Sequence, residues 1–485
     1  MLFGQLILFR QFHVVFFQHD LKYDRNSIFI IKQYKIMKIK LVAIVFFMGV
    51  MAFGQKSKES SQLIDALEHA SKQELLEKWY PLAVDREDGG FYSDITYDFK
   101  IGENQDKMIV TQARHLWVNS QAAMRYSRDR IYLSYATHGF EFLRDKMWDK
   151  NNGGFYTLVT KKGERIPREN DEKTAYGNAF AIYGLSAYFK ASGNKEALDL
   201  AKKTFYWLEK NSHDSINKGY YQALELDGTP IQRTADLSST SEAGYKDQNS
   251  SIHLLEALTE LYHVWPNALV KTRLEELFLL IRDTIINEDH YMNLFFTKNW
   301  KPVTFNNTSR ENIKKHYYMD HVSFGHDVET AYLLFEASEA LGRNDIETTL
   351  KIGKEMVDHS LENGWDEKLG GFYDGGYYFE GKQDLEIVDA DKNWWSQAEG
   401  LNTMLLMQKY FPDDKLDYRA YFDNLWVYVQ QYIMDNEHGG WYEWGIDTRP
   451  ETKTALKGQI WKATYHDYRA LINCVDQLKD NENRK

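Results

Sequence analysis

The chain is poor in cysteine and proline. It has 485 residues but only one cysteine, Cys474, and seven prolines. A single cysteine excludes an internal disulfide and any cluster of cysteine ligands for a metal. Because helix-breaking prolines are rare and long runs are rich in Ala, Leu, Glu and Lys, the sequence favours helices.

Basic residues are fewer than acidic ones, 59 Lys and Arg against 71 Asp and Glu, so the formal net charge is −12. A net negative charge argues against nucleic acid and anionic membranes as partners. Aromatic residues are abundant instead, at 15% of the chain with 13 Trp and 32 Tyr. Their flat apolar rings stack on the apolar faces of sugars, so this composition is typical of a carbohydrate-binding cleft.

Residues 1–54 have the features of an export signal rather than of a folded domain. A basic stretch starting at Met37 precedes an apolar run at 41–51, and a small-x-small cleavage pattern ends at Gly54. The apolar run is too short to span a membrane comfortably. We therefore expect translation to begin at Met37 and the mature protein to be exported to the periplasm. The remainder, 55–485, has no Pro- or Ser-rich linker and is expected to form a single domain.

A glycine-rich motif recurs along the chain. Its clear form is Asp-x-x-x-Gly-Gly-Phe-Tyr or the same motif with Trp in place of Phe, and two further copies are degenerate. Glycine pairs of this kind permit the tight backbone of a turn, so each copy is expected to be a turn with short strands. The six copies begin at Asp85, Asp149, Asn217, Glu288, Asp366 and Asp435.

Two helical patterns lie between successive copies of the motif. Six helical hairpins favour an all-α (α/α)6 barrel with short β-hairpin or turn connections, in which inner helices line a cleft. A solenoid of the same repeat is the alternative, although six hairpins are enough to close a ring. The helices are expected at 58–82, 108–126, 132–147, 175–191, 195–210, 251–265, 271–286, 328–341, 346–361, 394–410, 418–434 and 460–479.

Polar and aromatic groups stand near the starts of the expected inner helices. Each has an ordinary structural explanation as a buried ion pair, a core histidine or a core tryptophan. Because they occupy matching positions of successive hairpins, they are expected to converge on one cavity. They are Arg114; Asn249 with His253; His326 with Glu329; Trp394 and Trp395 with Glu399; and Trp461 with His466.

Three histidines with Glu and Arg indicate an acid–base site. His326 and Glu329 are three residues apart, so on a helix they share a face and the carboxylate can orient the imidazole. An imidazole held in this way can transfer protons near neutral pH. A metal site is the competing use of these groups, but no His-x-x-x-His or His-Glu-x-x-His spacing occurs among them, so no metal is expected. Phosphate loops, nucleophile elbows and dinucleotide fingerprints are absent from the sequence.

Three of these stretches resemble the N-acylglucosamine 2-epimerase superfamily, and within it the branch of cellobiose and mannobiose 2-epimerases. The resemblance extends over essentially the whole mature chain and includes Asn249-x-x-x-His253 and Tyr176-Gly-Asn. The three stretches are His326-Asp-Val-Glu329, Trp394-Trp395-x-Gln-Ala-Glu399 and Trp461-Lys-x-x-Tyr-His466.

The resemblance implies an (α/α)6 barrel and epimerisation at C2 of a reducing-end glucose or mannose, without a cofactor. A base removes the C2 proton of the open-chain sugar, a cis-enediolate forms, and an acid returns a proton to the opposite face. By motif match, His326 and His466 would transfer the protons and Glu329 would tune His326. Arg114 and His253 would bind the enediolate oxygens.

The resemblance also implies how the substrate is held. Asn249 and Tyr176 would position hydroxyl groups, Glu399 would belong to the substrate-binding set, and the tryptophans Trp394, Trp395 and Trp461 would stack on the sugars. The expected partner is a disaccharide or short oligosaccharide with a reducing-end glucose or mannose. No nucleic acid partner, and no membrane after signal cleavage, is expected, and the protein is expected to act as a monomer.

Three other functions remain open at this point. An N-acylglucosamine 2-epimerase or an aldose–ketose isomerase would share the enediolate, so product identity separates them. An (α/α)6 glycoside hydrolase would need a pair of carboxylates, for which Glu329 and Glu399 are candidates. A non-catalytic sugar-binding protein would retain the aromatic cleft alone.

Overall fold

The computed structural model describes residues 60–168, 171–233, 243–382 and 384–483. The chain divides into two compact units, Met1–Asp65 and Ala66–Lys485. Of the first unit only residues 60–65 are described, and they are helical. The predicted start at Met37, the cleavage at Gly54 and the export signal lie outside the described residues.

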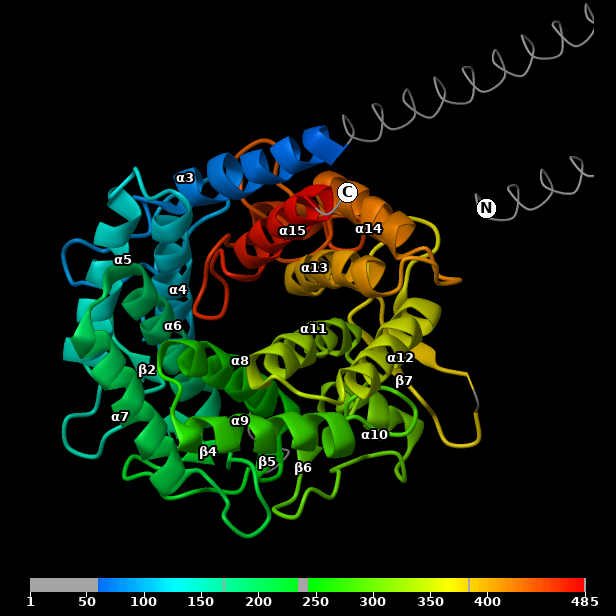
Figure 1. Ribbon diagram of the computed structural model, residues 1–485, viewed down its shortest axis with the longest axis horizontal. Helices are drawn as coiled ribbons and strands as arrows, with labels where there is room; N and C mark the ends of the chain where they lie inside the picture. The colour runs from blue at the N-terminus through cyan, green and yellow to red at the C-terminus, as the bar shows by residue number, and fades with distance from the viewer. Residues whose placement is uncertain (1–59, 169–170, 234–242, 383, 484–485) are drawn as a thin grey trace, which may run out of the picture. The chain divides into compact units, whose positions relative to one another are not determined.

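The second unit is built from helical hairpins, and the predicted (α/α)6 barrel is confirmed. Inner and outer helices alternate along the chain, and each inner helix packs against the next inner helix. Figure 1 shows the inner helices around the centre and the outer helices outside them. The inner helices are α4 (Ile109–Arg125), α6 (Ala175–Ser192), α8 (Gln248–Val264), α11 (Phe324–Leu341), α13 (Trp394–Tyr410) and α15 (His466–Asn483).

The outer helices are amphipathic, whereas the inner helices are buried nearly all round. In α6 every residue from Ala175 to Tyr188 is buried, as expected for a helix surrounded by protein. Three outer helices end in a π-helical turn, η2 (Leu143–Met147), η3 (Ile281–Ile285) and η5 (Val429–Ile433). The outer helices are α5 (Ile131–Phe142), α7 (Lys195–Asn211), α9 (Ala268–Leu280), α12 (Ile346–Gly364) and α14 (Tyr418–Tyr428).

The ring closes where α15 meets the beginning of the unit. The helical turns η1 (Ala70–Leu76) and α3 (Glu77–Trp79) precede the first hairpin, and η1 packs against α15. Arg125 at the end of α4 donates to Asp476 on α15 over 2.9 Å. The last inner helix therefore joins the first, which a solenoid would not allow.

Helix α15 begins later than the sequence analysis predicts. The expected helix starts at residue 460, but α15 starts at His466. Residues 460–465 form turns and bends instead, and their backbone carbonyls are used as acceptors by α4. Thr111 Oγ1 donates to the carbonyl of Ile460, and Arg114 donates to the carbonyl of Trp461. In a continuous helix these carbonyls would instead accept hydrogen bonds from N–H groups one turn later in the same helix.

Short antiparallel strand pairs connect successive hairpins, as predicted. Each sheet has two strands. In three sheets the strand before an inner helix pairs with a strand in the following connection, whereas β7 and β8 both lie between α12 and α13. In the first sheet Lys107 lies opposite Val159. The pairs are β1 (Lys107–Met108) with β2 (Leu158–Val159), β3 (Lys173–Thr174) with β4 (Ala223–Leu224), β5 (Lys246–Asp247) with β6 (Phe295–Phe296), and β7 (Gly375–Tyr377) with β8 (Glu386–Asp389). The short helices α10 (Arg310–Lys315), η4 (Tyr317–Met319) and η6 (Pro450–Thr454) complete the connections.

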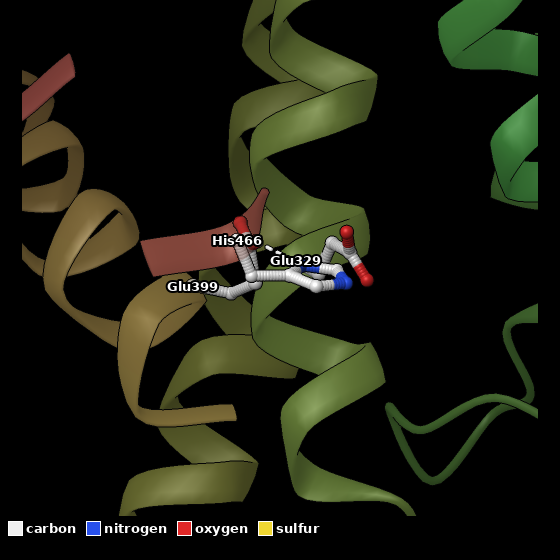
Figure 2. A group of neighbouring side chains, drawn as sticks. All are labelled: Glu329, Glu399 and His466. Atoms are coloured by element: carbon white, nitrogen blue, oxygen red, sulfur yellow. Dashed lines mark hydrogen bonds and ion pairs between the residues drawn. The ribbon is translucent and has the colours of Figure 1, made fainter. Parts of the chain in front are cut away.

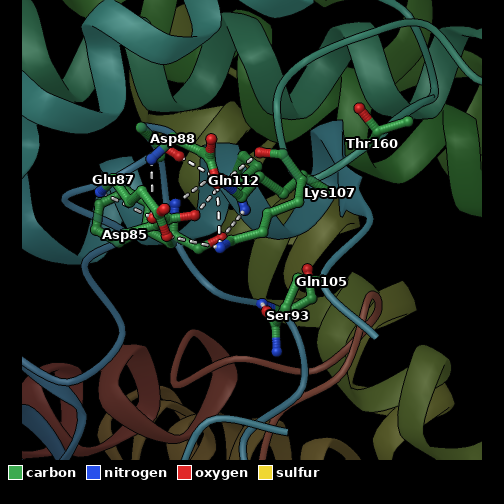
Figure 3. A network of polar contacts seen from close by, with 12 residues as sticks. Asp85, Glu87, Asp88, Ser93, Gln105, Lys107, Gln112 and Thr160 are labelled. Atoms are coloured by element: carbon green, nitrogen blue, oxygen red, sulfur yellow. Dashed lines mark hydrogen bonds and ion pairs between the residues drawn. The ribbon is translucent and has the colours of Figure 1, made fainter. Parts of the chain in front are cut away.

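The glycine-rich motif forms a turn that is tied to the next inner helix by a buried lysine. In the first copy, Lys107 Nζ lies 2.7 Å from Asp85 Oδ2 and also donates to the carbonyls of Gly89 and Lys161, at 2.5 Å and 2.8 Å. Figure 3 shows this network. Gly90 has a φ of 68°, and a Cβ there would lie 2.8 Å from Phe142 Cγ, so the second glycine of the pair is required.

Five of the six motif copies carry the same ion pair, which local spacing in the sequence did not predict. Both side chains are buried in every case, since none is more than 13% exposed. In the remaining copy Asn287 replaces the aspartate and Val322 replaces the lysine, so the two charges are lost together. The five pairs are Lys107–Asp85, Lys173–Asp149, Lys246–Asp214, Lys392–Asp366 and Lys457–Asp435.

The motif copy with Asn287 and Val322 suggests how to test whether the buried lysine–aspartate pairs stabilise the fold. Asp149→Asn leaves Lys173 buried without its counter-charge, and we expect the free energy of unfolding to fall by about 3–5 kcal/mol. The double variant Asp149→Asn with Lys173→Val copies the natural Asn287 and Val322 combination and should be clearly more stable than the single variant. Urea unfolding measures both. A double variant that loses as much stability as the single one contradicts this role for the pair.

Candidate active site

The predicted site residues come together at the N-terminal ends of the inner helices. Four of them lie seven residues after the position that holds the buried lysine in most motif copies. Arg114 follows Lys107 by seven residues, His253 follows Lys246, and Glu399 follows Lys392. Glu329 follows Val322, which stands in place of a lysine. This common register explains why residues far apart in the chain face one centre. His326 lies in the first turn of α11, and His466 is the first residue of α15.

His466 is held by a carboxylate. Its Nδ1 lies 2.7 Å from Glu399 Oε1, and Glu399 is 0% exposed. Figure 2 shows the two side chains approaching from α15 and α13, with Glu329 on the neighbouring α11. Because Nδ1–H donates to the carboxylate, Nε2 is the ring nitrogen that carries the free lone pair. His466 is therefore oriented to accept a proton.

His326 is held by a hydroxyl group instead. Its Nδ1 shares a hydrogen bond of 2.8 Å with Ser323 Oγ, and no described residue bonds its Nε2. The ring centroid of His326 lies 4.6 Å from that of Trp395, and the centroid of His466 lies 5.9 Å from the same tryptophan. The two histidines therefore contact one indole ring, and each leaves Nε2 available.

Arg114, on α4, lies beside His326 and His466. Its Nη1 donates to the carbonyl of Trp461 over 2.9 Å, and its Nη2 donates to Tyr176 Oη over 3.1 Å. The guanidinium also lies over the rings of Phe180 and Tyr465, 4.5 Å and 5.1 Å from their centroids. These contacts fix a positive group at the barrel centre without pairing it with a carboxylate of any described residue.

His253 is fixed by a carboxylate on its own helix. His253 Nδ1 lies 2.9 Å from Glu256 Oε2, and Tyr465 Oη donates to Glu256 Oε1 over 2.6 Å. The His253 ring also contacts the ring of Tyr176, at a centroid distance of 5.2 Å. His253 and Arg114 therefore both contact Tyr176.

A buried arginine, Arg469, connects these groups. It lies one turn after His466 on α15, is 1% exposed, and contacts Glu256, Glu329 and Glu399. The sequence analysis missed it, together with Glu256 and Ser323. A spacing signal existed for all three, because each lies three residues from one of the histidines.

Three of the side chains have the spacing of metal ligands. Ligand atoms of Glu329, Glu399 and His466 all lie within 4.8 Å of one another. Arg469 Nη2 lies 2.6 Å from Glu329 Oε1 and 2.7 Å from Glu399 Oε1, so a guanidinium already supplies positive charge to this group. The acid–base interpretation of these residues therefore fits the geometry better than a metal site.

Known proteins are similar to this chain in sequence and in fold. The model of the N-acylglucosamine 2-epimerase (GlcNAc 2-epimerase) family matches residues 90–470. The chain belongs to this family. A cellobiose 2-epimerase of Ruminococcus albus is 31% identical over 404 residues, 82% of this chain and 94% of the relative. One of Bacteroides fragilis is 29% identical over 408 residues, 83% of this chain and 96% of the relative.

Solved structures of the family agree. The cellobiose 2-epimerase of Spirochaeta thermophila matches with a TM-score of 0.73 and 28% identity, over 88% of this chain and 98% of that one. The N-acylglucosamine 2-epimerase resemblance drawn from the sequence motifs is confirmed, as is the (α/α)6 fold. The predicted class of protein, an isomerase that epimerises carbohydrates, is confirmed by the family membership.

The three tryptophans predicted to belong to the site differ in how deeply they are buried. Trp394 is 7% exposed and lies under Lys462, whose Nζ is 5.2 Å from the ring centroid. Trp395 and Trp461 are half-buried. Trp395 is therefore better placed than Trp394 to contact a sugar. Asn249 is half-buried on α8, and its side chain makes no hydrogen bond to another described residue.

The predicted contact between Glu329 and His326 is wrong. The sequence analysis expects Glu329 to orient His326, because the two share a helix face. In the structure Glu329 is paired with Arg469 from α15, and Ser323 holds His326. The buried guanidinium is the stronger partner for the carboxylate, since it offers a charge-assisted hydrogen bond.

Burial sets the charge states of the site. It lowers the pKa of His326 to about 3, with smaller contributions from His253 and His321, and lowers the pKa of His466 well below its ordinary value. Burial raises the pKa of Glu329 to about 7, helped by the neighbouring Glu399. Burial also raises the pKa of Glu399 to about 7, against the opposing effect of Arg469. Burial therefore favours the neutral form of both His326 and His466 in the free protein.

The low pKa of His326 predicts how stability depends on pH. An unfolded histidine binds a proton below about pH 6.5, whereas folded His326 does so only near pH 3, so acidification favours the unfolded state between these values. We expect the wild type to lose on the order of 2 kcal/mol of unfolding free energy between pH 7 and pH 5 relative to His326→Asn. Urea unfolding at both pH values measures the difference.

His115 provides the control for this measurement. It is 1% exposed, its pKa is lowered to about 3 by burial, and it stacks on Phe91 rather than on His326 or His466. His115→Asn should give a comparable pH-dependent difference in stability while the site chemistry stays intact. If the stability difference between wild type and His326→Asn does not change with pH, then His326 is not held in the neutral form by burial.

Proposed function

We propose that this chain is a disaccharide 2-epimerase that interconverts reducing-end glucose and mannose units, with cellobiose or β-1,4-mannobiose as substrate. The observation that carries the proposal is the pair His326 and His466. Each has Nδ1 anchored and Nε2 unbonded to any described residue, and both rings contact Trp395. The cellobiose 2-epimerases among its relatives, which align over most of both chains, support a disaccharide as substrate.

The chemistry needs two proton-transfer groups on opposite faces of C2. In the open-chain sugar, Nε2 of one neutral histidine takes the C2 proton, the C1 carbonyl becomes the enediolate, and O1 carries the negative charge. The other histidine must enter this step as the imidazolium, with a proton taken up from solvent at Nε2, and it gives that proton to the opposite face of C2 while the C1 carbonyl re-forms. After one turnover the two histidines have exchanged protonation states. The reverse reaction restores them, so each residue must serve as acid and as base.

The remaining residues stabilise and position the sugar. Arg114 presents a guanidinium that no carboxylate of the described residues neutralises, which suits the developing charge at O1, and His253 is a further donor. Tyr176, which contacts Arg114 and His253, and Asn249, which lies one turn before His253 on α8, would bind hydroxyl groups. Trp395 would stack on the reducing-end ring and Trp461 on the second sugar.

We further propose that the protein is exported to the periplasm and acts there as a monomer on incoming oligosaccharides. The basic and apolar stretch between Met37 and Gly54 motivates the proposal. Over the part of the chain that the structure describes, no helix is both long and apolar enough to cross a membrane. Cell fractionation with an antibody to the protein should find it in the periplasm. Recovery in the cytosol alone would remove the basis for export.

The activity is tested by proton NMR of the purified protein with cellobiose or β-1,4-mannobiose in D2O. We expect the C2 epimer to appear with deuterium at C2, because the histidine that returns a proton to C2 has exchanged that proton with D2O. A ketose product would make the protein an aldose–ketose isomerase, and free monosaccharide would make it a glycoside hydrolase. Turnover of N-acylglucosamine alone would contradict a disaccharide substrate.

A further inference from the structure

Arg469 occupies the centre of a buried charged cluster beneath the histidines. Its Nη1 donates hydrogen bonds to Glu256 Oε1 and to Tyr465 Oη, the second over 2.6 Å. Its Nη2 donates to Glu329 Oε1 over 2.6 Å and to Glu399 Oε1 over 2.7 Å. The three carboxylates come from three different inner helices, α8, α11 and α13. A single guanidinium therefore joins four inner helices, counting its own.

Two of these carboxylates are the partners of site histidines. Glu256 holds His253 over 2.9 Å, and Glu399 holds His466 over 2.7 Å. Glu399 uses the same oxygen, Oε1, for His466 and for Arg469. Any displacement of that carboxylate away from Arg469 would rotate or release the His466 ring, so the position of Arg469 and the direction of Nε2 are linked.

We propose that Arg469 is a positioning residue for the epimerase site, which sets the orientation of His466 and His253 through Glu399 and Glu256. This role rests on the proposed epimerase function. The planar fork of arginine can bond two pairs of acceptors at once, whereas the point charge of lysine cannot span them. Without the guanidinium, three buried carboxylates would repel one another and separate.

The structure provides a route for chemical rescue. A cavity of about 510 Å³ lies on the side of Arg469 away from the histidines, lined also by Glu256, Trp117 and Tyr332. Its lining residues Glu336 and Glu339 are exposed, so the cavity is open to solvent. A small guanidinium ion can therefore reach the space that Arg469→Ala would vacate.

The kinetic test compares Arg469→Ala, Arg469→Lys and a control, Arg125→Ala. Arg125 forms an ion pair with Asp476 on the same helix, but it is outside the site. We expect kcat to fall by about 100-fold in both Arg469 variants with a much smaller change in KM, because misplacing a catalytic group by about 1 Å has this effect. The control should keep its kcat.

Rescue separates positioning from a general loss of structure. Millimolar methylguanidinium should raise kcat of Arg469→Ala by at least about tenfold, whereas sodium chloride at the same ionic strength should not. A kcat within about threefold of wild type in Arg469→Ala, or full activity in Arg469→Lys, would overturn the proposal. So would equal rescue by both salts.

A second readout does not depend on turnover. The proton between His466 Nδ1 and Glu399 should give a downfield NMR resonance that disappears in His466→Asn. This resonance should be shifted or lost in folded Arg469→Lys and retained in Arg125→Ala. An unchanged resonance in Arg469→Lys would overturn the proposal. If the wild type epimerises neither disaccharide, the proposed function fails, and this resonance still decides the role of Arg469.

Discussion

The buried lysine–aspartate pair of each connecting turn is the contact on which the arrangement of the barrel depends. In five of the six units it ties the glycine turn of one hairpin to the segment that leads into the next inner helix. In four units the inner helix begins two residues after the lysine, and three site residues, Arg114, His253 and Glu399, lie seven residues after it. The chemistry at the barrel centre is therefore positioned by contacts made at its edge.

The one unit without the pair is the unit that carries His326. There Asn287 and Val322 stand where the other turns have aspartate and lysine, and Val322 leads directly into α11. An apolar residue at this entrance keeps a buried positive charge away from the imidazole four residues later. His466, the other histidine to which we assign proton transfer, is the first residue of α15 and is held by Glu399 instead.

Much of this could be predicted from the sequence because the chain repeats. The glycine motif indicated the number of hairpins, and matching positions in successive hairpins identified Arg114, His253, His326 and Glu399 as neighbours. The late start of α15 could not be predicted, since it depends on α4 using the backbone carbonyls of the preceding loop. Arg469 has partners up to 213 residues away, and no local spacing indicates them.

The roles of Glu329 and the tryptophans show the same limit. Spacing on one helix placed Glu329 beside His326, but a buried guanidinium from another helix is its actual partner. Adjacent tryptophans could not be told apart in the sequence, because burial under Lys462 separates Trp394 from Trp395 only in three dimensions. Local spacing identified which side chains share the site, while the partners of each required the fold.

The central claim, two histidines on opposite faces of C2, is tested most directly by hydrogen–deuterium exchange with one histidine removed. His326→Asn and His466→Asn would each be incubated in D2O with glucose-ended and mannose-ended disaccharide separately, and C2 would be followed by NMR. We predict that each variant exchanges the C2 proton of one epimer only, with retention, and that the two variants label opposite epimers. Continued epimerisation by either variant, or labelling of the same epimer by both, would contradict the two-histidine mechanism.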